Sequence, residues 1–181
     1  AGWNYHNHRD ASLTRFLPMA ERMVEKGYWV LRMGAIVEMG LPTNHPKIID
    51  YATQYRSPFG DVFLLATCKF FIGDTAGIYR LASAFGTPVA LSNLTPLAYM
   101  NTGCVPMHNL VMPKRVVRRA NDIALSISEE LELAVDRLVA AEQFETLGLT
   151  LVENSAAEIL GMAEEIDARI DGTWRDKPED E

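Results

Sequence analysis

The sequence has little that would suit a nucleic acid or a membrane as a partner. It holds 17 Lys and Arg against 24 Asp and Glu, a formal net charge of −7 at pH 7, and it offers no basic stripe of the kind that binds a phosphate backbone. No apolar run approaches the roughly 20 residues of a membrane span, and the opening residues are polar and aromatic, unlike a signal peptide. We therefore expect neither a nucleic-acid partner nor a membrane span.

Cysteine and histidine are also scarce. The two cysteines, Cys68 and Cys104, lie far apart, which excludes a CxxC zinc ribbon and gives no disulfide framework. His6 and His8 form one close pair, and nothing completes a set of metal ligands around them. The sequence thus predicts a cytoplasmic protein with no metal and no other cofactor.

The chain has the size of one domain. Its 181 residues are 48% hydrophobic, enough for one core and too few for two domains of ordinary size. We predict one domain over residues 1–172 and a charged tail over residues 173–181. Because the chain has no initiating Met and opens in what reads as a loop, we interpret it as a piece of a longer protein.

What is present is an alternation of helix and strand patterns. The first part predicts a helix over residues 16–26, stopped by Gly27, and then short buried strands over 28–34 and 48–51. Ser57-Pro58 marks the start of another helix. The predicted apolar face of that helix consists of Phe59, Val62, Phe63 and Ala66.

The middle of the chain has the pattern of a βαβ unit. An apolar strand over 69–73 leads into the polar turn 74–77, a helix closed by Gly86, and a strand over 89–91. The predicted buried face of this helix consists of Ile78, Leu81, Ala82 and Phe85. Near-continuous apolar strands are typical of parallel sheets. We therefore predict a Rossmann-like three-layer α/β domain with a mainly parallel sheet, helices on both faces and residues 69–72 near the centre of the sheet.

Two capping boxes mark helices in the last third. Ser126 with Glu129 and Ser155 with Glu158 have the required spacing, and we interpret Glu158 as a member of its box. Residues 110–112 read as one more strand, and 149–152 as a short apolar run. The last helix is predicted to bury Ile159, Ala163, Ile166 and Ile170.

The turn over residues 74–77 is the most informative place for a ligand. In a doubly wound sheet, ligands bind beyond the carboxyl ends of the strands, and a helix N-terminus there offers unpaired N–H groups to an anion. Gly77 would let a phosphate approach closely, which makes Asp74, Thr75, Ala76 and Gly77 candidate ligands. The alternative is that Asp74 or Thr75 only caps the helix.

This segment resembles the phosphate loop of the GT-B glycosyltransferases. Residues 68–77 (CKFFIGDTAG) and 84–89 (AFGTPV) are similar to the Asp-Thr-Gly and Phe-Gly-x-Pro elements of heptosyltransferases, with Ala76 inserted before the glycine. A closer likeness is to a largely uncharacterised family of bacterial proteins assigned as glycosyltransferases. That likeness rests on residues 7–10, 30–34, 49–51 and 153–159, and so spans nearly the whole chain.

The resemblance implies a function. The chain would be the C-terminal, nucleotide-sugar-binding half of a GT-B enzyme that transfers a sugar from a nucleotide-diphosphate donor to an unknown glycan or small-molecule acceptor, without an obligatory metal. Its partner would be the missing N-terminal domain of the same protein. Because a GT-B site forms between two domains, we expect this chain alone to have little or no transferase activity.

Four further donor-binding candidates follow from this resemblance. Arg9 and Arg32 would hold the diphosphate, because a guanidinium offers paired donors to phosphate oxygens; the alternative for each is a surface salt bridge. Asp50 would accept a hydrogen bond from a ribose or sugar hydroxyl, or else cap the following turn. Asn93 would contact the base or the sugar, or else serve a turn.

No catalytic base is identified, although Asp10 and His8 are candidates. In GT-B enzymes the other domain often supplies this group. The competing interpretation is a non-catalytic nucleotide- or sugar-phosphate-binding module that keeps the phosphate loop without transfer activity. A flavodoxin-like regulatory domain ranks third, because no acidic cluster follows the early strands.

Overall fold

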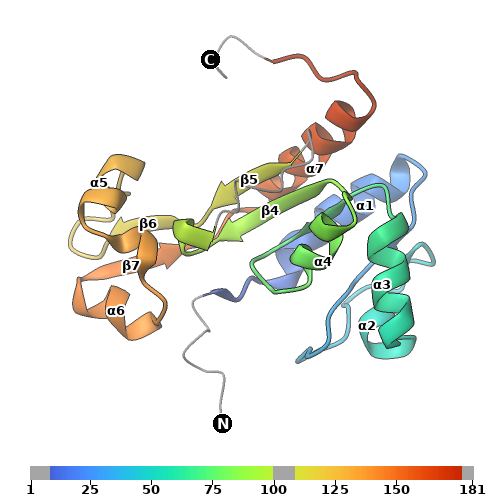
Figure 1. Cartoon of the computed structure of the whole chain (residues 1–181), viewed down its shortest axis with the longest axis horizontal. Coiled ribbons are helices and arrows are strands. Elements are labelled where there is room, and N and C mark those ends of the chain that lie inside the picture. The colour runs from blue at the N-terminus through green and yellow to red at the C-terminus, as the bar shows by residue number, and fades with distance from the viewer. Residues whose placement is uncertain (1–8, 100–108, 177–181) are drawn as a thin grey trace.

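A computed structural model of the chain describes residues 9–99 and 109–176 (Figure 1). The first part begins with a 3-10 turn, η2 (Leu13–Phe16), that continues into α1 (Leu17–Glu25). Pro18 lies in the first turn of α1, where its missing N–H costs no hydrogen bond, and Gly27 follows the helix with φ 100°. The helix predicted over residues 16–26 is therefore confirmed.

The next elements form a small parallel pair of strands and two helices. β1 (Val30–Leu31) pairs with β2 (Ile48–Ile49), and α2 (Tyr51–Gln54) and α3 (Pro58–Thr67) follow. Both strands are shorter than predicted, and Tyr51 opens a helix rather than closing a strand. The Tyr51 hydroxyl explains this change, because it donates to the carbonyl oxygen of Ser57 and accepts from its N–H, each at 3.0 Å.

The central sheet has three parallel strands. β3 (Phe71–Gly73), β4 (Val89–Leu94) and β5 (Leu110–Pro113) lie in the order β3-β4-β5, and α4 (Tyr79–Ala84) connects the first two. The βαβ unit and the parallel sheet are thus confirmed. The predicted central position of residues 69–72 is wrong, because β4 is the middle strand and β3 an edge. Lys69 lies outside the strand, where its amino group pairs with Asp167 at 2.6 Å.

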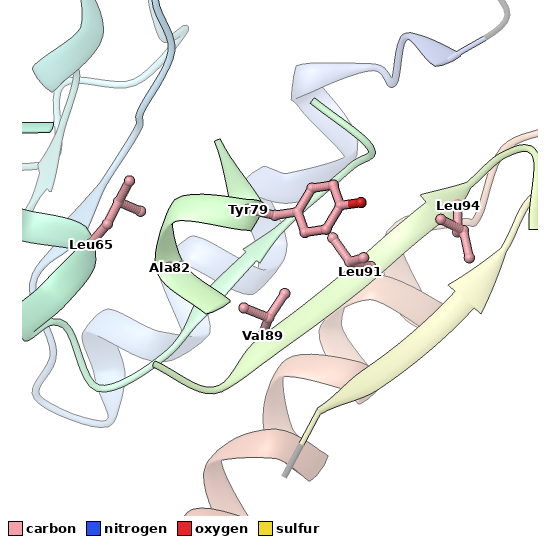
Figure 2. Packing of buried hydrophobic residues seen from close by; sticks show 6 residues of the cluster. All are labelled: Leu65, Tyr79, Ala82, Val89, Leu91 and Leu94. Atoms are coloured by element: carbon pink, nitrogen blue, oxygen red, sulfur yellow. The ribbon is translucent and has the colours of Figure 1, made fainter. Parts of the chain in front are cut away.

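Helices cover both faces of this sheet, as predicted. On one face, Leu65 of α3 and Tyr79 and Ala82 of α4 pack with alternate residues of β4 (Figure 2). On the other face, α1 and the last helix pack against Ala90 of β4 and the partly buried Ile72 of β3. The described residues therefore have the three layers of a Rossmann-like arrangement.

The apolar face predicted for α3 is wrong. Phe59, Val62 and Phe63 are 77%, 40% and 53% exposed, whereas Leu65 is 1% exposed. Two contacts fix the rotation of the helix: Leu65 enters the core beside α4, and Gly60 lies so close to the Tyr51 hydroxyl that a side chain there would collide with it. Tertiary contacts therefore turn the more hydrophobic side of α3 outward.

The chain continues from β5 into a lobe with a core of its own. β6 (Arg115–Arg118) pairs antiparallel with β7 (Leu149–Val152), and α5 (Ile127–Glu132), η4 (Val135–Arg137) and α6 (Ala141–Thr146) pack around them. The sequence indicated an apolar run at β7 but no strand at β6. Both capping boxes are confirmed, at α5 and at α7 (Ala156–Ile170). A short 3-10 turn, η3 (Leu97–Tyr99), contacts η4.

Glu130 in this lobe gives a pH-dependent prediction. It is 6% exposed, and burial, with the negative charge of Asp136, raises its pKa from 4.5 to about 7. Because the folded state holds this proton more tightly than the unfolded state, stability should fall as the pH rises from about 4.5 to about 7. Glu130→Gln should therefore raise the free energy of unfolding at pH 8 by about 2 kcal/mol and change it little at pH 4.

Urea denaturation at the two pH values measures this difference. Glu132→Gln on the same helix is the control, because Glu132 is exposed. If Glu130→Gln changes stability equally at pH 4 and pH 8, the buried carboxyl is not the source of the pH dependence.

Candidate functional site

The turn after β3 differs in detail from the sequence-based prediction. We expected a helix from about Thr75, but α4 begins at Tyr79. The Asp74 carboxylate accepts the N–H of Ala76 at 2.9 Å, and the buried Thr75 hydroxyl donates to the carbonyl oxygen of Thr95 at 3.5 Å. Asp74 therefore closes a tight turn that delays the helix. Neither it nor Thr75 caps α4, and the N–H of Ala76 is already occupied.

Gly77 remains the open point of this turn. It is exposed, and a side-chain carbon added there would meet no atom within 4 Å. Burial raises the pKa of Asp74 above its ordinary value, and the nearby negative charge of Asp10 adds to this, against the hydrogen bond from Ala76 and the positive charge of Lys114. The turn thus lies among charged groups from other parts of the chain.

Asn93, near the end of β4, is tied to Asn154 after β7. The N–H of Asn93 donates to the side-chain oxygen of Asn154 at 2.6 Å, and the N–H of Asn154 donates to that of Asn93 at 2.7 Å. The Asn154 amide also donates to the carbonyl oxygen of Pro113 at 3.0 Å. Asn93 has φ 54° and is 0% exposed. Asn93 therefore lies at an irregularity within β4 and not in a turn, and its carboxamide is buried.

The first described residues lie across the same edge of the sheet. Lys114, which directly follows β5, donates to the carbonyl oxygen of Asp10 at 2.6 Å, and the N–H of Ser12 donates to Glu153 at 3.0 Å. Arg15 reaches the carbonyl oxygens of Glu153 and Asn154 at 3.2 and 3.0 Å. Burial lowers the pKa of Lys114, although the acidic groups Glu153, Asp74 and Asp10 favour its charge.

Arg9 joins this edge through Tyr99. Its guanidinium donates to the Tyr99 hydroxyl at 3.0 Å and lies 4.7 Å from the centre of the Tyr99 ring. We call the set of residues at the carboxyl ends of β3, β4 and β5 the carboxyl-edge cluster. It consists of Arg9, Asp10, Asp74, Thr75, Ala76, Gly77, Tyr79, Asn93 and Lys114.

Three buried polar atoms of this cluster have no hydrogen-bond partner among the described residues. They are Nε of Arg9, Nδ2 of Asn93 and the hydroxyl oxygen of Tyr79. Figure 2 shows the Tyr79 ring beside Leu91, with the hydroxyl pointing away from helix α4. Buried polar groups are nearly always hydrogen-bonded. These unpaired groups are therefore a feature to be explained.

The other two predicted residues interact with each other. Arg32 and Asp50 pair with each other at 3.1 Å where β1 and β2 end, and Arg32 also donates to the carbonyl oxygen of Met39 at 2.9 Å. Burial would raise the pKa of Asp50, but hydrogen bonds from Thr53, the N–H of Leu41 and Arg32 hold it below its ordinary value. The pair holds the loop before β2 in place. This arrangement corresponds to the salt bridge that the sequence analysis gave as the alternative for Arg32.

Sequence reasoning missed Lys114 and Tyr79. Lys114 had a usable signal, because it follows a predicted strand at its carboxyl end, as Asp74 does. Tyr79 had none, since an aromatic residue early in a helix reads as core. Of the two candidate bases, Asp10 lies in the cluster, and His8 lies outside the described residues, as do His6 and Cys104. In residues 9–99 and 109–176, no three His, Cys, Asp or Glu side chains are grouped to hold a metal.

No family model, curated protein or solved structure matches the chain. Within the described ranges, no helix combines the length and the apolar character that a membrane crossing requires. The chain is of the mixed α/β class, with a parallel central sheet in a Rossmann-like layout.

Proposed function

We propose that this chain binds a nucleotide-diphosphate sugar at the carboxyl-edge cluster, as the donor-binding half of a GT-B type glycosyltransferase. Three features support the proposal. The loop sequence resembles a GT-B phosphate loop, the cluster lies where parallel α/β sheets bind ligands, and the cluster combines cationic with carboxylate groups. Arg9 and Lys114 would face phosphate oxygens, while Asp10 and Asp74 would accept hydrogen bonds from sugar hydroxyls.

The observation that carries the proposal is the set of unpaired buried groups. Arg9 and Asn93 each hold a donor nitrogen without an acceptor, and Tyr79 has an unpaired hydroxyl. A diphosphate and a sugar are rich in acceptor oxygens. Such a ligand would satisfy these groups, with the open space at Gly77 for its phosphate.

Gly77→Val should weaken binding of nucleotide diphosphate at least tenfold and leave the fold intact. The valine would fill the open space without striking the protein, and a β-branched residue at this position costs little local stability. Titration calorimetry with UDP, GDP and ADP measures the effect, with EDTA present because we propose binding without a metal. Gly161→Val is the matched control, since Gly161 also has open space beside it but lies on α7.

Tyr79→Phe separates a binding site from a packing defect. If the unpaired hydroxyl is only a packing defect, its removal should leave the stability of the protein equal or higher and nucleotide binding unchanged. If it contacts the donor, nucleotide binding should weaken about fivefold or more while stability does not fall. Binding that is unchanged in both Tyr79→Phe and Gly77→Val would place the nucleotide elsewhere. Binding without sugar transfer, even in a longer form of the protein, would favour the non-catalytic module.

A further inference from the structure

A groove lies outside the carboxyl-edge cluster, between β2, the loop that precedes it, α2 and α3. Its volume is 790 Å³, within the range of roughly 300 to 1,000 Å³ that is typical of small-molecule sites. The residues that matter for its chemistry are Asn44, His45, Gln54, Tyr55 and Phe63. The proposed donor site makes no use of them.

The groove has an aromatic wall that is open to solvent. Tyr55 and Phe63 line it and are 66% and 53% exposed. Phe63 also stacks on Phe59, with 6.0 Å between ring centres and 19° between planes. The two rings therefore form one exposed aromatic surface, of which only Phe63 lines the groove. Grouped exposed aromatic rings of this kind mark binding sites more often than isolated ones do.

The rest of the groove presents polar groups that can form hydrogen bonds. His45 Nδ1 accepts the N–H of Lys47 at 3.1 Å, so a neutral His45 carries its proton on Nε2 as a donor. The carboxamides of Asn44 and Gln54 have no hydrogen-bond partner in the part of the chain that the structure describes. The Asp50 carboxylate is already engaged by Arg32 and the N–H of Leu41. The available polar groups thus include donors and, in the carboxamide oxygens, acceptors beside an aromatic wall.

We propose that this groove binds a planar heteroaromatic ring of the nucleobase type. The ring would stack against Phe63 and Tyr55, and its edge nitrogen and carbonyl acceptors would receive hydrogen bonds from His45, Asn44 and Gln54. A purely hydrocarbon ring could form hydrogen bonds with none of these side chains. The inference does not rest on the phosphate loop, because the groove belongs to the β1-β2 side of the fold.

Nucleosides test the groove without a phosphate. Adenosine, guanosine, cytidine and uridine are titrated into the protein by calorimetry, with indole as a ring that stacks but has no edge acceptor and ribose as a ring-free control. We expect at least one nucleoside to bind with a Kd of about 1 mM or lower. Indole should bind at least about fivefold more weakly, and ribose should not bind.

Matched phenylalanine variants locate the ring. Phe63→Ala should weaken nucleoside binding at least about fivefold, the lower end of what stacking on an aromatic side chain contributes. Phe59→Ala is the control, because Phe59 lies on the same helix and is 77% exposed but does not line the groove. Circular dichroism confirms that both variants are folded; both positions are exposed, so we expect no loss of structure.

A further variant tests the polar side chains of the groove. Gln54→Leu should weaken nucleoside binding about threefold to tenfold, with indole binding unchanged or tighter. Three outcomes would overturn the proposal. The first is that no nucleoside binds at about 5 mM ligand, and the second is that Phe63→Ala and Phe59→Ala weaken nucleoside binding equally. The third is that Gly77→Val abolishes nucleoside binding and Phe63→Ala does not. Failure of the donor proposal looks different, since that proposal concerns nucleotide diphosphate and the variants Gly77→Val and Tyr79→Phe.

Discussion

Asp167→Ala is expected to lower the free energy of unfolding by about 3 to 5 kcal/mol, the usual cost of removing one partner from a buried ion pair. The Asp167 side chain is 1% exposed and receives hydrogen bonds from Lys26, from Lys69 at 2.6 Å and from Tyr28 at 2.8 Å. Lys26 and Tyr28 lie in the segment after α1 and Lys69 lies just before β3, whereas Asp167 itself lies on α7. Without the carboxylate, two ammonium groups would face each other with no buried counter-charge. Urea denaturation at pH 7 measures the loss.

Asp171→Ala is the matched control for this variant. Asp171 pairs with the same Lys69 at 2.8 Å but is 49% exposed, so its removal should cost about 1 kcal/mol or less. If the two variants are equally stable, burial of Asp167 is not what makes the network important.

The same carboxylate makes stability depend on pH. Burial would raise the pKa of Asp167, but hydrogen bonds from Lys26, Lys69 and Tyr28 outweigh it and hold the pKa below its ordinary value of 3.8. A carboxyl with a lowered folded pKa contributes stability above the unfolded pKa and loses it as the pH falls further. Between pH 5 and pH 2, Asp167→Ala should therefore lose less stability than the parent chain.

Asn154→Ala is expected to cost about 3 kcal/mol, because it removes two buried hydrogen bonds at once. The N–H of Asn93 would lose its acceptor and the carbonyl oxygen of Pro113 its donor. Asn154 is 2% exposed and Asn93 is 0% exposed, so water cannot readily replace either bond. Thermal and urea denaturation measure the loss.

Asn121→Ala tests whether burial matters here. Asn121 also accepts a backbone N–H, from Ile123 at 3.2 Å, but it is exposed. Its replacement should cost about 1 kcal/mol or less. A loss at Asn154 no larger than that at Asn121 would contradict the view that the asparagine pair joins the two parts of the chain.

Local patterns predicted α1, α3, α4, α5, α7 and the βαβ unit, but not α2 or α6. Pro18 and Gly27 bound α1, and the boxes at Ser126 and Ser155 lie where their helices begin, because caps act within a few residues of sequence. Contacts between distant segments could not be read in this way. The outward rotation of α3 depends on Tyr51 and on a core formed with α4. The pairing of β6 with β7 joins segments separated by about thirty residues.

For the candidate site, the sequence predicted which residues follow the strand ends but not which side chains pair with one another. The rule that ligands lie beyond strand ends led to residues 74–77 and Asn93, which the structure brings to one edge with Arg9. It also led to Arg32 and Asp50, which pair with each other instead. The rule cannot tell which polar side chains satisfy one another, because that depends on loop paths. Here the paths of the loops over residues 34–47 and 9–15 decide which polar side chains pair.

The lobe built on β6 and β7 has its own enclosed core of Val116, Leu125, Val135, Phe144 and Leu149. A segment with a separate core can open as a cooperative unit while the rest of the molecule keeps its native contacts. Its amide protons would then exchange with solvent together, at a rate distinct from that of the layers around the parallel sheet. Asn154 lies where the chain leaves β7, so each opening of the lobe would strain its hydrogen bonds to Asn93. Local unfolding of the lobe would in this way be coupled to the conformation of the carboxyl-edge cluster.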